Sequence, residues 1–407
     1  MPWAPRSIVS GAASVLSVLA LFAAFPRALR AEEGPEGLDL EHLHVTDGGA
    51  TAPLERGGVA ELTLDPKLQR AARRLLALAR PERGAVTMIH ARSGRLLAWA
   101  ETSSSGRAAA LETSRQPAAS VFKLVTTTAL LEEGVVTPRT EVCTAGGNHR
   151  IERRHLEVPK SGRVICAPFG LALGHSRNAA YAQLATRHLS RDELEDTAQR
   201  FGFNQPLPFD VKIPLGTLTI PYGDLDFART AAGFSGSTLS PLGAAQLAYT
   251  VAAGGRKIRL RIVGRSDAFE APSSREMLGR VTDEWTANRL LKMMEVTARE
   301  GTSAEVFRDE TGRPYLPNIR VAGKTGTLKP SSREPTTSWF TGFAPSRRPE
   351  VVVSVMLVNG GVWRRKANEL ARDMMRAYFH DRGRRGVSDP FEDPALPQKP
   401  ASEIARR

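Results

Sequence analysis

The order of hydrophobic and polar positions predicts alternating strands and helices between residues 59 and 380. From Leu68 to Ala79 hydrophobic residues recur at helical spacing, directly after an Asp-Pro pair that is typical of a helix start. Similar helical patterns follow at 120–134, 179–189, 190–203, 241–253, 283–300 and 368–380. Strands are predicted at 59–64, in two runs of 84–100 joined by a turn at 92–94, and at 319–328, 338–345 and 349–359. Because helices separate an early pair of strands from a late trio, we expect an α/β chain of the α+β type, with an antiparallel sheet built from both ends of the domain.

The pattern is different before residue 59 and after residue 380. Residues 7–26 carry no charged side chain and are about as long as a helix that crosses a hydrocarbon layer of ~30 Å. We expect a retained single-pass signal-anchor in the inner (cytoplasmic) membrane, with residues 1–6 in the cytoplasm and the catalytic part outside, in the periplasm. Secretion after signal cleavage is the alternative, although no clean A-x-A site follows. Residues 27–58 are polar and Gly-rich like a linker, and residues 381–407 are expected to be a disordered basic tail.

Composition narrows the class of protein only moderately. The chain has 407 residues, 41% hydrophobic and 24% charged, which argues against a wholly disordered or fibrous protein. Two cysteines are too few for a disulfide scaffold. The net charge of +13 would suit a nucleic acid, an anionic membrane or a cell-wall polymer. Because the arginines are spread along the chain without a recognisable nucleic-acid motif, we expect no nucleic-acid partner.

Candidate chemistry begins with the motif Ser120-Val-Phe-Lys123 at the start of a predicted helix. Residues three apart on a helix share a face, so the amine of Lys123 can approach the hydroxyl of Ser120. A serine hydroxyl is a weak nucleophile until a base removes its proton. A lysine acts as that base only if its pKa is lowered, and partial burial with a second cation such as Lys324 would lower it. The free N–H groups of a helix start also favour an anionic intermediate.

Two further motifs follow, Ser176-Arg-Asn178 and the segment 324–327, Lys-Thr-Gly-Thr. In a loop, the hydroxyl of Ser176 could relay a proton, and the amide of Asn178 could hold a substrate carbonyl or the lysine. His175 precedes Ser176, but neighbours on an extended chain point in opposite directions, so we expect it outside the site. A strand edge at 324–327 offers a cation, hydroxyls for a carboxylate and a backbone that pairs with a peptide. Gly326 would leave room for the substrate to approach.

Each motif is weak alone, since S-x-x-K is expected by chance about once in such a chain. In this order, however, the three motifs resemble the transpeptidase domain of penicillin-binding proteins, within the superfamily that also contains the serine β-lactamases. The resemblance covers about residues 59–380. It includes the segments LTLDPKLQRAA, GAVTMIHARSGRLLAWA, PAASVFK, FGF, STLSPLGAAQLA, VAAGG, VAGKTGT and SWFTGFAP. It implies an antiparallel sheet flanked by helices, with an all-helical subdomain.

The resemblance also implies catalytic roles for five residues. Ser120 would be the acylated nucleophile and Lys123 its general base. Ser176 would shuttle the proton, Asn178 would contact the substrate, and Lys324 would tune the proton network. No metal and no cofactor are implied.

The substrate-binding roles implied by the resemblance fall on the third motif. Thr325, Gly326 and Thr327 would bind the carboxylate of a D-Ala-D-Ala stem peptide, and the N–H groups of Ser120 and Thr327 would form the oxyanion hole. The reaction would release D-alanine and transfer the acyl group to an amine of a second peptidoglycan stem peptide. β-Lactams would acylate Ser120 as substrate mimics. The chain has no glycosyltransferase module, so a separate glycosyltransferase is an expected partner.

Three alternatives remain open from the sequence. A D,D-carboxypeptidase or a serine β-lactamase would use water in place of the amine. A class A β-lactamase is disfavoured because the predicted helix RDELEDTAQRF has no E-x-x-L-N pattern. A non-catalytic β-lactam-binding sensor or scaffold would keep the same pocket, although the five intact motif residues argue against lost catalysis.

Cys143 and Cys166 flank a Gly- and charge-rich loop just before Ser176. An exported location would permit a disulfide between them, which would stabilise the fold by about 3 kcal/mol in the chain-entropy model. A buried pair of free thiols is the alternative.

Overall fold

The structure is a computed structural model of the chain and describes residues 37–104, 116–267, 269–329, 331 and 334–392. The chain separates into two compact units, 1–33 and 34–407, and all the described residues belong to the second. The expected membrane span at 7–26 lies outside the described residues. Among the helices that are described, none has the length and apolar character needed to cross a membrane.

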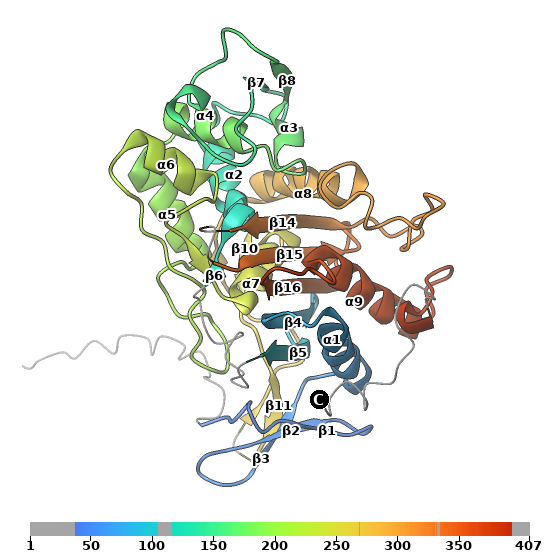
Figure 1. Cartoon of the computed structure of the whole chain (residues 1–407). Coiled ribbons are helices and arrows are strands. Elements are labelled where there is room, and N and C mark those ends of the chain that lie inside the picture. The colour runs from blue at the N-terminus through green and yellow to red at the C-terminus, as the bar shows by residue number, and fades with distance from the viewer. Residues whose placement is uncertain (1–36, 105–115, 268, 330, 332–333, 393–407) are drawn as a thin grey trace, which may run out of the picture. The chain divides into compact units, whose positions relative to one another are not determined.

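The centre of the described unit is a five-stranded antiparallel sheet (Figure 1). Its strands, in spatial order, are β14 (Ala322–Leu328), β15 (Thr336–Ala344), β16 (Val351–Asn359), β4 (Arg83–His90) and β5 (Leu96–Ser103). The late trio thus pairs with the early pair through β16 and β4, with Val351 opposite His90. The predicted sheet is confirmed, and β14 forms one of its edges.

Helices cover both faces of this sheet. One face carries α1 (Pro66–Ala79) and α9 (Ala367–Asp381), and the other carries α7 (Pro241–Ala252), α8 (Glu284–Arg299) and, further out, α2 (Lys123–Glu132) (Figure 1). Alternate residues of β16 pack in opposite directions because side chains alternate along a strand. Val353 and Val355 join the core beneath α1 and α9, whereas Val352 and Met356 join the core beneath α2 and α7. This double burial explains why β16 is mainly apolar, and all of its residues are buried.

A helical subdomain lies beyond the β14 edge of the sheet (Figure 1). It contains α2 with α3 (Phe169–Ala172), α4 (Asn178–His188), α5 (Arg191–Phe201) and α6 (Asp224–Ala231). The predicted start of α5 is confirmed, because Ser190 and Glu193 cap it reciprocally. The subdomain is not entirely helical, however, since β7 (Glu141–Thr144) and β8 (Ile165–Pro168) form a two-stranded ladder within it.

The prediction of a linker at 27–58 is wrong for residues 37–58. This segment contributes to a second five-stranded sheet at the far end of the unit (Figure 1). The sheet consists of β1 (His44–Val45), β2 (Ala50–Pro53), β3 (Val59–Leu62), β11 (Val263–Ser266) and β12 (Phe269–Glu270). Strands as short as β1 and β2 leave little alternation in the sequence, so local patterns do not reveal them. The pairing of β3 with β11, about 200 residues away, completes the sheet.

The prediction of a disordered tail is wrong for residues 382–392. Val387 is buried, and Phe391 packs against the core beneath α1 and α9. The guanidinium of Arg74 in α1 lies 4.4 Å from the centre of the Phe391 ring. Residues 393–407 lie outside the described part of the chain.

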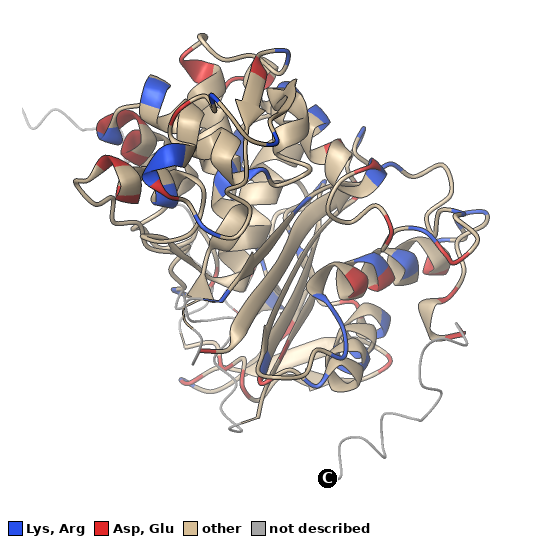
Figure 2. Cartoon of the chain, turned by 45° about the horizontal axis from the view of Figure 1, so that its top comes forward, with Lys and Arg blue, Asp and Glu red and all other residues tan. Residues whose placement is uncertain are grey.

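The basic charge is distributed rather than concentrated. Figure 2 shows Lys and Arg interspersed with Asp and Glu on helices and loops, while the central strands are mainly uncharged. Such mixing supports many local ion pairs, and the largest lies on α9.

This cluster is built around Asp373, whose side chain is fully buried. Its oxygens accept from Arg365 and Arg372 at 2.7 Å and from Arg376 at 3.2 Å. Arg372 and Arg376 also stack over the Tyr315 ring, at 4.4 and 4.6 Å. Burial raises the pKa of Asp373, but the adjacent arginines outweigh this effect and hold the pKa below its usual value. The cluster therefore attaches the segment before β14 to α9.

We predict that Asp373→Ala lowers the free energy of unfolding by about 3–5 kcal/mol, because it leaves buried guanidinium groups without their carboxylate. Chemical denaturation at neutral pH measures this loss.

Since the pKa of Asp373 is lowered in the folded state, its stabilisation is present above the unfolded pKa of about 3.9 and is lost as the pH falls through the folded pKa. The matched control is Asp226→Ala, which removes an exposed pair with Arg229 and should cost less than about 1 kcal/mol. Equal losses in the two variants at neutral pH would contradict the prediction.

Candidate active site

Ser120 and Lys123 lie where a 3₁₀ turn, η1 (Ala119–Phe122), passes into α2. Ala119 has a left-handed φ of 49°, which turns the chain sharply into η1. Lys123 is the first residue of α2, and its Nζ lies 2.7 Å from Oγ of Ser120. The helical spacing therefore brings amine and hydroxyl together as the sequence predicts. Ser120 is half-buried, while Lys123 is fully buried.

The Lys123 amine has two further oxygen neighbours. Its Nζ donates to Oδ1 of Asn178 at 2.7 Å and to the carbonyl oxygen of Ala232 at 2.6 Å. The Tyr181 ring, 5.3 Å away, helps to exclude water. A neutral amine has two hydrogens and one lone pair. In the neutral form, Asn178 Oδ1 and the Ala232 carbonyl can accept both hydrogens, which leaves the lone pair for the hydroxyl of Ser120.

The electrostatic surroundings favour this neutral form. Burial, and next to it the charge of Lys324, lower the pKa of Lys123 well below its ordinary value. Burial also lowers the pKa of Lys324, to about 7. Burial and a neighbouring cation are the two features expected from the sequence if Lys123 is to act as a base.

Ser176 and Lys324 form the second contact between motifs. Nζ of Lys324 donates to Oγ of Ser176 at 3.0 Å and to the carbonyl oxygen of Thr325 at 2.7 Å. Ser176 has a φ of 54° and lies in the turn before α4, and Asn178, expected in a loop, is the first residue of α4. This turn also corrects the interpretation of His175. Because the chain is not extended there, His175 and Ser176 line the same groove.

The third motif lies on the edge strand β14, as predicted, and Gly326 packs against the turn that carries Ser120. It is buried, and a Cβ atom on it would lie 3.2 Å from Val121 and 3.3 Å from both Ala119 and Trp339. The absence of a side chain at Gly326 thus lets β14 pack closely against η1. Side chains alternate along a strand, so Thr325 and Thr327 face the other way, into the groove.

The motif residues line a groove of about 840 Å³. Its walls include Ser120, Ser176, Asn178, Thr325 and Thr327, together with Asn148, Glu300, Thr302, Trp339 and Trp363. A second hollow of about 470 Å³ continues on the side of Ala232 and Gly233, and also reaches Ser120. The nucleophile candidate therefore lies where two hollows meet, which suits an extended ligand bound on both sides of it.

Sequence reasoning missed three groups at the site. The carbonyl of Ala232 accepts from Lys123, and the carbonyl of Asn148 accepts from Nδ2 of Asn178 at 2.5 Å. Both act through the backbone, so their side chains give no signal. The hydroxyl of Thr302 lies 2.6 Å from that of Thr325 and extends the row of hydroxyls along the groove.

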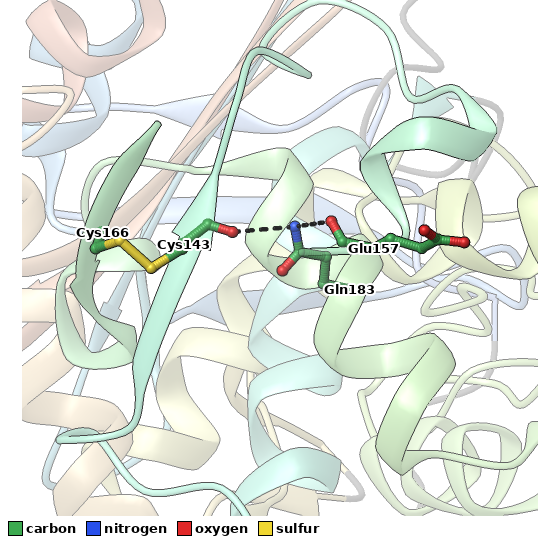
Figure 3. Close-up of a disulfide and its surroundings, with 4 residues drawn as sticks. All are labelled: Cys143, Glu157, Cys166 and Gln183. Atoms are coloured by element: carbon green, nitrogen blue, oxygen red, sulfur yellow. Dashed lines mark hydrogen bonds between the residues drawn. A yellow bond between two sulfur atoms is a disulfide. The ribbon is translucent and has the colours of Figure 1, made fainter. Parts of the chain in front are cut away.

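A disulfide joins Cys143 of β7 to Cys166 of β8, which are directly paired in the ladder (Figure 3). It closes residues 144–165, which we call the disulfide loop. Nε2 of Gln183 on α4 donates to the carbonyls of Cys143 at 3.2 Å and of Glu157 at 2.8 Å (Figure 3). Within the described residues, the single group of close potential metal ligands is Glu141 with these two cysteines. Sulfur atoms bonded to each other are not thiolate ligands, so this group is not a metal site as it stands.

Curated proteins with similar sequences are named peptidoglycan D,D-transpeptidases. The chain is 27% identical over 257 residues to the peptidoglycan D,D-transpeptidase PbpA of Mycobacterium tuberculosis, covering 60% of this chain and 50% of that protein. It is 26% identical over 350 residues to PbpA of Mycolicibacterium smegmatis, covering 75% of this chain and 68% of that protein. The chain thus spans about half the length of the M. tuberculosis relative.

Solved structures share the fold. The D,D-transpeptidase domain of a peptidoglycan glycosyltransferase from Eggerthella lenta matches with a TM-score of 0.65 and 23% identity, over 80% of this chain and 83% of that one. PBPA from M. tuberculosis matches with a TM-score of 0.64 and 23% identity, over 80% and 81%. The family described as penicillin binding protein transpeptidase domain matches residues 84–376, more than half of the chain. The resemblance of the three motifs is thereby confirmed, and the chain belongs to the penicillin-binding protein transpeptidase domain family.

Proposed function

We propose that this protein is a peptidoglycan D,D-transpeptidase that is acylated on Ser120 by D-Ala-D-Ala stem peptides. One observation carries the proposal: the buried Lys123 amine has acceptors for two hydrogens and directs its remaining position at Ser120 Oγ, 2.7 Å away. The curated relatives bear the same activity in their names.

In the acylation step, Ser120 Oγ attacks the carbonyl carbon of the D-Ala-D-Ala peptide bond while its proton passes to Nζ of Lys123. The N–H groups of Ser120 and Thr327 stabilise the oxyanion of the tetrahedral intermediate. The proton then reaches the nitrogen of the leaving D-alanine through the hydroxyl of Ser176, which Lys324 orients. The C–N bond breaks, D-alanine departs, and an ester remains on Ser120.

In the second step, an amine of another stem peptide attacks this ester. The attacking amine loses a proton to Lys123, the new peptide bond forms, and the C–O bond to Ser120 breaks. The proton returns to Ser120 Oγ, and the free enzyme is restored. No net proton, metal or electron is consumed in the cycle.

Substrate orientation follows from the edge strand. The hydroxyls of Thr325 and Thr327, which line the groove, favour binding of the terminal carboxylate of the donor. An extended stem peptide can pair along the free edge of β14. Gly326 belongs to this strand but, being packed on η1, supports its position.

The cellular setting belongs to the same proposal. We place an anchor at 7–26, the catalytic domain at 59–380 on the periplasmic side of the inner membrane, and a separate glycosyltransferase as partner. The apolar run at 7–26 supports the anchor, and the disulfide supports an oxidising compartment.

The first test uses a fluorescent penicillin, and then a D-Ala-D-Ala stem peptide with and without an acceptor amine. We expect stable labelling that Ser120→Ala abolishes and the exposed control Ser273→Ala retains, and a cross-linked product that requires the acceptor. Rapid loss of the label would indicate a β-lactamase. Release of D-alanine without any cross-linked product would indicate a carboxypeptidase. Absence of labelling would indicate a non-catalytic scaffold.

A second prediction concerns pH. The rate of acylation by penicillin should rise with pH as Lys123 loses its proton. In Lys324→Met the neighbouring cation that lowers the pKa of Lys123 is gone, so that pKa rises and the acidic limb of the profile moves to higher pH. Lys366→Met, which changes an exposed lysine of the same groove, should leave the limb in place. An unmoved limb in Lys324→Met would refute the coupling between the two lysines.

A third prediction concerns Gly233. A Cβ atom there would lie 2.1 Å from the carbonyl oxygen of Ala119, so Gly233→Ala must displace η1 and Ser120. We expect acylation to slow by on the order of 10²-fold. The control Gly254→Ala has a similar φ of 67° but free space, with its nearest neighbour at 3.9 Å. It should cost about 1 kcal/mol of stability and leave the acylation rate unchanged. Equal rates in both variants would show that η1 tolerates the displacement.

A further inference from the structure

The disulfide loop reaches the base through a chain of two hydrogen bonds. The carbonyl oxygen of Asn148, within the loop, accepts from Nδ2 of Asn178 at 2.5 Å. At the other end of the same amide, Oδ1 of Asn178 accepts from Nζ of Lys123 at 2.7 Å. Asn178 is therefore a two-ended connector between loop and base.

The polarity of this connector has chemical consequences. An amide side chain has a donor end and an acceptor end, and it can present either one to Lys123. The Asn148 carbonyl is an acceptor only, so it requires the NH₂ group of Asn178 on the loop side. Oδ1 then faces Lys123 and accepts one of its hydrogens. In the reversed orientation the NH₂ group would donate to the lone pair of Lys123, which must receive the proton of Ser120.

The disulfide loop is tethered to the subdomain at several points. Residues 145–161 of the loop, together with Gln183, line a hollow of about 710 Å³. At its base the Cys143–Cys166 bond joins the two arms, and Nε2 of Gln183 links the carbonyls of Cys143 and Glu157 (Figure 3). The position of Asn148 thus depends on these tethers.

A third tether lies next to Asn148. The side chain of Ile151 is buried in a small core with Ala179, and its carbonyl accepts from Arg229 at 3.2 Å. Gly147 passes so close to α4 that a Cβ on it would lie 2.8 Å from Cβ of Ala179. The loop therefore approaches the first turn of α4, next to Asn178.

We propose that the Cys143–Cys166 disulfide and Gln183 act as positioning elements for catalysis, by holding the Asn148 carbonyl where it orients the Asn178 amide toward Lys123. This inference rests on the proposed function, in which Lys123 is the base. It goes beyond stabilisation, because it makes the reactivity of Ser120 depend on the disulfide in protein that remains folded.

The test compares oxidised protein with folded protein reduced by dithiothreitol, which converts the disulfide to two thiols and is itself oxidised to a cyclic disulfide. The two cysteines are the only ones in the chain, so reduction changes nothing else. We expect the second-order rate constant for acylation by fluorescent penicillin to fall by about tenfold. The acidic limb of its pH profile should move to lower pH, because Lys123 loses an acceptor that favours its protonated form.

Three variants sharpen the test. Gln183→Ala should slow acylation in the same direction, and reduction should add little to its effect, because both tethers act on one loop. The double variant Cys143→Ser with Cys166→Ser should have the acylation rate constant of the reduced protein. Dithiothreitol should not change that rate constant. The control Arg154→Ala changes an exposed side chain of the same loop and should match the wild type.

Thermal unfolding and alkylation of the thiols accompany each rate measurement. Unchanged rate constants and pH limb, in folded protein with both thiols alkylated, would overturn the positioning role. A smaller labelled fraction with an unchanged rate constant would also overturn it, because that result indicates a structural role alone. Absence of labelling in the oxidised wild type would instead overturn the proposed function, and this inference with it.

Discussion

A lysine amine that is removed from water requires oxygen acceptors or a lowered pKa, and the Lys123 amine has both. It lies among Ser120 Oγ, Asn178 Oδ1 and the Ala232 carbonyl, and burial lowers its pKa. Each of these oxygens comes from a different part of the fold. The surrounding structure can therefore be understood as the support that holds three oxygen atoms around one nitrogen.

The sheet and the helical subdomain each supply part of this support. Helix α2 brings the amine to Ser120, the start of α4 brings Asn178, and the segment after α6 brings the Ala232 carbonyl. Strand β14 brings Lys324, whose charge depresses the pKa of Lys123 further. Close approach between these elements requires residues without side chains, which is why Gly326 packs against η1 and Gly233 against the Ala119 carbonyl. Beyond this assembly, the carbonyl of Asn148 links the disulfide loop to the base through the amide of Asn178.

Local patterns predicted most of the regular elements because long amphipathic helices and doubly buried strands leave strong periodicity. The helix after Asp65, the capped start of α5 at Ser190, and the paired strands β14 to β16 follow this rule. The predictions for 37–58 and 382–392 are wrong for two different reasons. In 37–58, the strands β1 and β2 are too short to leave a clear alternation in the sequence. In 382–392, Phe391 packs against α1, a distant contact that leaves no local signal.

At the site, the sequence by itself determined the chemical groups and their order along the chain. The spacing of Ser120 and Lys123 already placed an amine next to a hydroxyl, since a helical turn is a local structure. Only the tertiary structure decided that the amine is fully buried, which backbone carbonyls accept its hydrogens, and that His175 shares the groove with Ser176. It also decided that Gly326 packs closely against η1. The physical reason is that a pKa and a hydrogen-bond geometry depend on atoms that surround a group in space, and side-chain identities do not encode where the backbone carbonyls of distant segments will lie.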